Sequence, residues 1–128
     1  MRVPRSLPAL EALQWFGLLA GPLAFAAEHV IGLGATFARC NPAGEVLGVE
    51  QHLYQLTTMA VAAAIVVAAE MAALLAFLGT HGLDFEADPP PGRIRFLATA
   101  ALVLGPILLT LVLLSGLGAY VHAPCRQA

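Results

Sequence analysis

Apolar residues fill three long stretches of the chain, and polar residues gather in the short segments between them. The stretches run roughly over residues 13–38, 53–78 and 94–121. A helix of about 20 mostly apolar residues crosses the roughly 30 Å core of a bilayer, because its backbone polar groups are satisfied within the segment. The pattern therefore predicts an all-α integral membrane protein, a single unit over residues 1–128 with three transmembrane helices.

The two links between the stretches are short and rich in proline and glycine. Residues 41–44 read Asn-Pro-Ala-Gly, and residues 89–92 read Pro-Pro-Pro-Gly. Such clusters favour turns, because proline removes a backbone donor and does not continue a helix. The sequence contains no internal repeat and no second domain.

Arginines near the ends of the spans set the expected orientation. Four lie on the side of the N-terminus and two on the other side: Arg2, Arg5, Arg93 and Arg95 against Arg39 and Arg126. Cytoplasmic segments carry the excess of positive charge. We therefore expect the N-terminus inside and, after three crossings, the C-terminus outside.

A cleaved signal peptide is an alternative interpretation of the first stretch. Arg2 and Arg5 precede an apolar run, and the small residues around Phe25 resemble a cleavage site. Cleavage would leave two spans. Apolar character resumes at once over residues 30–35, which favours an uncleaved first span.

Composition and charge exclude several classes of protein. Of 128 residues, 59% are hydrophobic and 11% charged, against about 45–50% and about 25% in ordinary soluble domains. A net charge of -2 without any lysine offers no basic surface for nucleic acid. Phosphate-binding, nucleophile-elbow, HExxH and CxxC motifs are all absent from the sequence. We expect no catalytic residues, no enzyme activity, no bound metal and no cofactor.

Two cysteines follow apolar spans on the side predicted to be outside. Cys40 ends the first span and Cys125 follows the third. An oxidising compartment permits a disulfide between them. Two unpaired thiols, or a metal site that includes His52 or His122, are the alternatives.

Three ionisable residues lie well inside the spans, namely Glu28, His29 and Glu70. Ionised groups at membrane depth are costly, so such residues face the protein interior, pair with another group or mark an ion path. The sequence leaves three roles open for the carboxyls: a hydrogen bond to a backbone carbonyl, contact with a partner subunit, or proton transfer. Helical rise predicts that Glu28 and Glu70 are offset by about 10 Å in depth.

Histidines raise a haem hypothesis as the alternative function. His29 lies at membrane depth, whereas His52 and His122 match each other in depth near the outer boundary. A histidine in a membrane helix can serve as an axial ligand. These three residues are therefore the candidate haem ligands of a small redox or proton-handling membrane protein.

Small residues at helical spacing predict close helix contacts. In the first span Gly17 and Gly21 form a small-xxx-small pair. In the second span alanines recur at every fourth position, namely Ala60, Ala64, Ala68 and Ala72. These faces are expected to meet a partner complex, and a self-assembling oligomer joined through the glycine pair is a further alternative.

Three features of the sequence resemble a group of small three-span bacterial membrane proteins. They are the segment Trp-Phe-Gly-Leu-Leu-Ala-Gly-Pro-Leu-Ala-Phe over residues 15–25, the Cys40 that closes the same span, and the closing Pro124-Cys125. Members of that group are often encoded beside cytochrome c oxidase genes. The resemblance implies a non-catalytic accessory or assembly subunit of a respiratory complex in the bacterial cytoplasmic (inner) membrane. The resemblance assigns a catalytic role to none of the residues.

Overall fold

The computed structural model describes residues 6–40, residues 51–121 and Cys125. The described chain forms three long helices, α1 (Leu7–Cys40), α2 (Gln51–Gly79) and α3 (Pro91–Val121). All three are long and apolar enough to cross a membrane. The predicted all-α architecture, with three helices long and apolar enough to cross a membrane, is confirmed, and each helix extends beyond the span predicted for it at one end or both.

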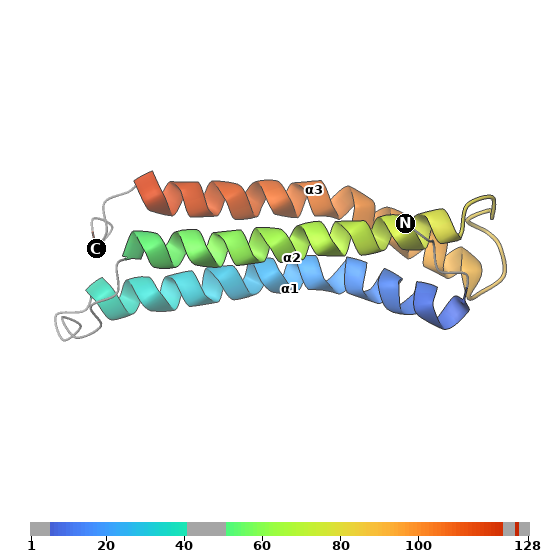
Figure 1. Cartoon of the computed structure of the whole chain (residues 1–128), viewed down its shortest axis with the longest axis horizontal. Coiled ribbons are helices and arrows are strands. Elements are labelled where there is room, and N and C mark those ends of the chain that lie inside the picture. The colour runs from blue at the N-terminus through green and yellow to red at the C-terminus, as the bar shows by residue number, and fades with distance from the viewer. Residues whose placement is uncertain (1–5, 41–50, 122–124, 126–128) are drawn as a thin grey trace.

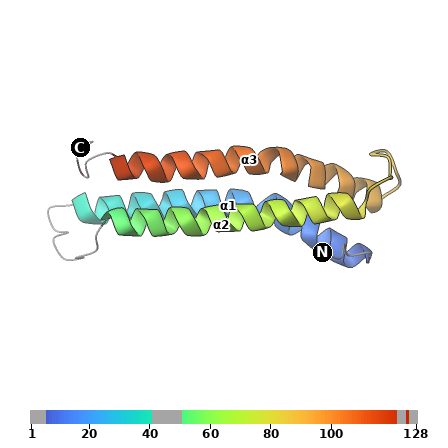
Figure 2. The same cartoon turned by 45° about the horizontal axis from the view of Figure 1, so that its top comes forward.

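The three helices lie side by side in an elongated bundle (Figure 1), and each contacts the other two. α1 and α3 run in the same direction, and α2 runs opposite to both. Figure 2 shows the N-terminal part of α1 turning away from the axis of α2. We call the end with Cys40 and Cys125 the disulfide end, and the end with residues 80–90 the loop end.

Local sequence explains where the helices meet the loop end. α3 starts at Pro91, a favoured first helical position because the N–H that proline lacks would have no partner inside the helix. α2 ends at Gly79, and Gly82 then adopts a φ of +88°, a conformation that glycine reaches without steric cost. Pro22 and Pro106 lie inside α1 and α3, which continue through them.

Small side chains make up most of the interior. One buried cluster near the loop end consists of Leu10, Ala76, Ile94 and Ala98. A second cluster farther along the bundle consists of Ala24, Ala62, Val66 and Val112. Because lipid is as apolar as these side chains, the helices associate mainly through close packing.

α1 and α2 approach each other closely at Gly17. A Cβ added there would lie 2.9 Å from both the Cβ and the backbone N of Ala73, and 3.0 Å from the Ala69 carbonyl oxygen. Only hydrogen fits at this contact, so Gly17 sets both the separation and the register of the two helices.

We predict that Gly17→Ala destabilises the bundle more than Gly34→Ala does. Gly34 has no atom within 4 Å of an added Cβ, so it reports the gain in helix propensity alone. Overpacking at Gly17 is expected to cost about 1–3 kcal/mol relative to this control. The measurement is unfolding by sodium dodecyl sulfate in mixed micelles, followed by circular dichroism. Equal midpoints for the two variants would contradict the packing assigned to Gly17.

Candidate functional site

Polar side chains enter the bundle interior at two depths. Gly17 contacts Ala69 and Ala73, so Glu70 lies level with Gly17. Glu28 lies eleven residues farther along α1, which is about 16 Å toward the disulfide end. The offset between the carboxyls is larger than the expected 10 Å, because the Gly17 contact and not the middle of each span sets the register.

Glu28 is buried on the inner face of α1. The residue is 7% exposed, and the Ser115 side chain of α3 is near enough to interact with its carboxyl. Its Oε2 has no hydrogen-bond partner among the described residues. Glu28 therefore faces a neighbouring helix of its own chain, as the spacing of the first span predicts.

His29 points to the outside of the bundle, with a side chain that is 46% exposed. Its Nδ1 lies 3.0 Å from the Phe25 carbonyl oxygen and 3.8 Å from Glu28 Oε2. A carbonyl oxygen only accepts, so the Nδ1–H donates to Phe25 one turn earlier. The Phe25 ring packs beside the imidazole with centroids 4.2 Å apart.

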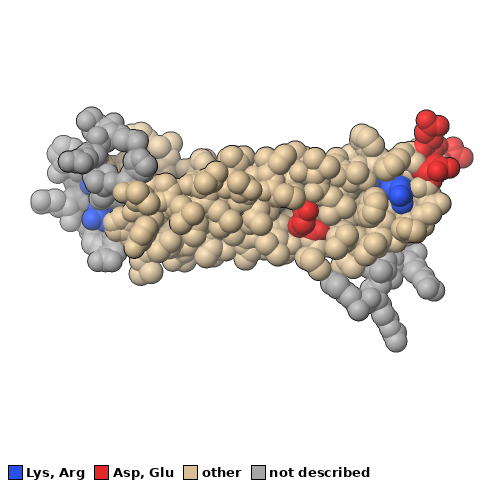
Figure 3. Space-filling view, turned by 90° about the horizontal axis from the view of Figure 1, so that it is seen from above, with Lys and Arg blue, Asp and Glu red and all other residues tan. Residues whose placement is uncertain are grey.

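Glu70 lies at the seam between α2 and α3. Its carboxyl occupies the space that a side chain at Gly105 would fill, since a Cβ built on Gly105 would overlap the carboxylate oxygens. The residue is only partly buried. Figure 3 shows an acidic spot on the tan body of the bundle, apart from the charged side chains toward the two ends. In the described part of the chain Glu70 has no hydrogen bond and no ion pair.

Sequence reasoning missed two buried amides, Gln14 and Gln55. Gln14 is 0% exposed, and neither its Nε2 nor its Oε1 has a partner within the described residues. Gln55 is also buried and leaves its Oε1 unpaired there. The signal for Gln14 was present, because it falls on the face of Gly17, Gly21 and Glu28 at intervals of three or four residues.

The two arginines near the start of α3 interact with other parts of the chain at the loop end. Arg93 on α3 forms an ion pair with Glu11 on α1. Arg95 donates from Nη1 to the Thr80 carbonyl oxygen at 2.7 Å and lies over the rings of Phe77 and Phe85. These contacts fasten the C-terminus of α2 to the start of α3.

The candidate haem ligands are not brought together as a set in the described chain. His52 is exposed and stacks edge-on against Tyr120, with centroids 5.3 Å apart, and His122 lies outside the described residues. No group of three or more metal-ligating side chains exists within the residues that the structure describes.

The small-residue faces divide between the interior and the surface. Gly17 and Gly21 are buried against α2 and α3 of their own chain, so they are not available for the self-assembly considered above. On α2, Ala72 is buried, whereas Ala60, Ala64 and Ala68 are exposed. We call these three exposed residues the alanine ridge from here on.

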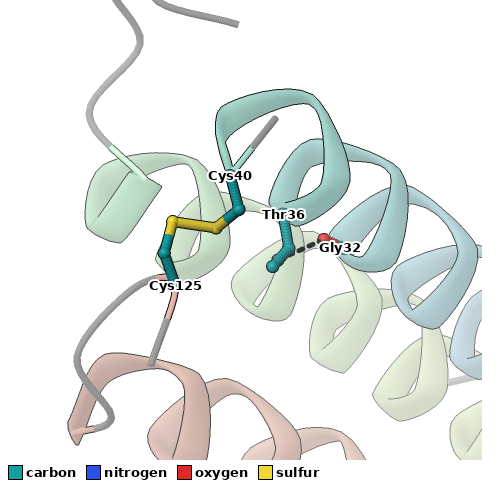
Figure 4. Close-up of a disulfide and its surroundings, with 4 residues drawn as sticks. All are labelled: Gly32, Thr36, Cys40 and Cys125. Carbon is teal, nitrogen blue, oxygen red and sulfur yellow. Dashed lines mark hydrogen bonds between the residues drawn. A yellow bond between two sulfur atoms is a disulfide. The ribbon is translucent and has the colours of Figure 1, made fainter. Parts of the chain in front are cut away.

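A disulfide joins Cys40 to Cys125, as predicted. The Cα atoms lie 5.3 Å apart, within the range that a bridge requires. The bond links the last residue of α1 to the segment after α3 (Figure 4). One turn earlier, the Thr36 hydroxyl donates to the Gly32 carbonyl oxygen. The covalent link closes the bundle at this end.

No protein-family model, no curated protein and no solved structure matches the chain.

We predict that Cys125→Ser lowers the stability of the bundle toward sodium dodecyl sulfate. The bridge spans 85 residues of sequence, and a loop of this size is expected to contribute about 2–4 kcal/mol by restricting the unfolded chain. Thr57→Ser, an exposed change on α2 that keeps the hydroxyl, is the control for the effect of a substitution that breaks no disulfide. Mass analysis of the wild-type protein should find maleimide on the cysteines only after reduction, and labelling without reductant would contradict the bridge.

Proposed function

We propose that this chain is a non-catalytic accessory or assembly subunit that packs against a larger membrane protein complex. The observation that carries the proposal is the alanine ridge, Ala60, Ala64 and Ala68. Its three small side chains face out of the bundle on successive turns of α2. Small residues on successive turns allow the backbones of two membrane helices to approach closely.

The rest of the surface supports the same function. Large apolar side chains on all three helices are exposed, among them Leu23, Val67 and Leu114. The described charged residues other than Glu28 and Glu70 lie toward the ends of the helices or in the loop at the loop end. A chain of this kind offers surface for lipid and for other helices, with little polar surface on which to assemble a reaction site.

The resemblance of residues 15–25 and of the two cysteines to small oxidase-associated proteins supports a respiratory complex, in particular a terminal oxidase, as the partner. It also supports the bacterial cytoplasmic membrane as the location. The disulfide fits this location, because it requires an oxidising compartment at one end of the bundle.

We predict that the protein migrates with a larger complex in blue-native electrophoresis of membranes solubilised in mild detergent. Ala64→Phe is expected to reduce the fraction in the complex, because a large ring prevents close approach of a partner helix to the alanine ridge. Leu23→Phe on the exposed face of α1 is the matched control. Migration of the wild-type protein only as a small free species would contradict the proposal.

We also propose that the loop end is cytoplasmic and the disulfide end is outside. The arginines at the loop end support this orientation, as does the need of the disulfide for an oxidising compartment. Alkaline phosphatase, which needs disulfides to fold, should be active when fused after residue 128 and inactive when inserted near residue 86. The opposite pattern would reverse the orientation.

A further inference from the structure

The carboxyl of Glu70 has no partner within the described chain. It occupies the notch above Gly105 at the seam of α2 and α3 and is partly exposed there. Gly105, which faces the carboxyl across the seam, offers no side-chain donor. Nine residues of α2 separate it from Gly79, about 14 Å along the helix, so Glu70 lies within the apolar part of the bundle.

The two arginines of α3 are engaged near the loop end, although Arg95 Nε has no hydrogen-bond partner among the described residues. Arg93 pairs with Glu11, and Arg95 donates to the Thr80 carbonyl. Because Arg95 lies ten residues before Gly105 on α3, its backbone is about 15 Å from the level of Glu70. The imidazole of His29 lies about 18 Å away in depth, twelve residues beyond Gly17.

A second copy of the chain would bring another carboxyl to this position instead of a permanent donor. Two copies related by a two-fold axis along the membrane normal hold every residue at the same depth. Contact through the α2–α3 seam would then place the two Glu70 carboxyls opposite each other. Two ionised carboxylates repel, and the two groups can hydrogen-bond to each other only when at least one of them is protonated.

Glu28 differs from Glu70 in its burial and in the polar groups of its own chain that lie near it. Glu28 is almost fully buried, with the Ser115 side chain close to its carboxyl and the His29 Nδ1 at 3.8 Å. Its interactions are therefore within its own chain. Glu70 is the carboxyl at membrane depth that another molecule can reach.

We propose that the surface of the α2–α3 seam around Glu70 docks a transmembrane helix of another protein, and that this helix presents a hydrogen-bond donor side chain to the Glu70 carboxyl. The seam surface is defined by Glu70 with Val67 and Leu74, which lie three and four positions from it on α2 and are exposed. The donor is an arginine, lysine, tryptophan, hydroxyl or amide side chain at the same depth. This inference rests on the proposed function, and it adds the chemistry of the partner.

The test compares Glu70→Leu and Glu70→Gln in the full-length protein by blue-native electrophoresis. Interhelical hydrogen bonds in membranes contribute about 1–2 kcal/mol in model peptides. We therefore expect Glu70→Leu to lower the ratio of complexed to free protein about fivefold to thirtyfold. Glu70→Gln keeps an acceptor oxygen and should retain part of the complex.

The control is Thr110→Val on the exposed face of α3. The Thr110 hydroxyl donates to the Pro106 carbonyl oxygen of its own helix, so its loss should leave the complex unchanged. Unfolding by sodium dodecyl sulfate verifies that the Glu70 variants are folded. A folded Glu70→Leu variant that forms the wild-type amount of complex would overturn the inference and leave the proposed function intact.

A photo-crosslinking amino acid at position 67 or position 30 identifies what lies on the seam. Val67 is 48% exposed beside Glu70, and Val30 is exposed on α1. We expect position 67 to crosslink to a membrane helix of another protein with a donor residue at the depth of Glu70, and position 30 not to do so. A crosslink from position 67 only to lipid, or to a second copy of the chain, would overturn the inference. A wild-type protein found only in the free form would instead overturn the proposed function.

Discussion

The contact of Gly17 with Ala69 and Ala73 is the constraint on which the arrangement of the bundle depends. Apolar helices in lipid gain little from hiding apolar surface, so their association requires many close van der Waals contacts. Two backbones come close enough only where side chains are absent or small. At Gly17 an added Cβ would lie 2.9 Å from the Cβ and the backbone N of Ala73 on α2. This contact fixes the register of α1 and α2. Gly105 and Gly116 of α3 receive the side chains of Glu70 and Met59 of α2, so glycines of α3 set close contacts between α2 and α3 as well.

Much of the fold could be predicted from the sequence because lipid imposes a simple length criterion. Each span of about 20 apolar residues had to be helical to satisfy its backbone, and the observed helices contain the predicted spans. The inner face of α1 was also predictable, since Gly17, Gly21 and Glu28 repeat at helical spacing and all are buried. The pairing of Cys40 with Cys125 followed from the parity of three crossings, which brings the ends of α1 and α3 to the same side.

The inner face of α2 could not be predicted, and the reason is physical. Periodicity identifies a buried face in soluble proteins because the other face is polar. On α2 alanine occupies both faces, so no contrast in polarity marks the interior. The buried alanines include Ala62, Ala69 and Ala73, and the exposed ones include Ala60, Ala64 and Ala68. The buried amides were missed for a related reason. A search for ionisable groups passes over glutamine, although Gln14 is more completely buried than either carboxyl in the spans.

The two carboxyls show how position in the bundle decides what a polar group at membrane depth does. Both are acidic side chains within apolar helices, and sequence alone gave them the same set of roles. Glu28 lies on the face of α1 that the bundle covers, with Ser115 and His29 near its carboxyl. Glu70 lies at a seam, where its carboxyl occupies the space above Gly105 and has no hydrogen-bond partner among the described residues. The glycine notch orients the carboxyl without satisfying it. A group fixed in place and left unpaired is prepared for a donor from outside, because its orientation has already been restricted and contact with lipid gives it no alternative hydrogen bond.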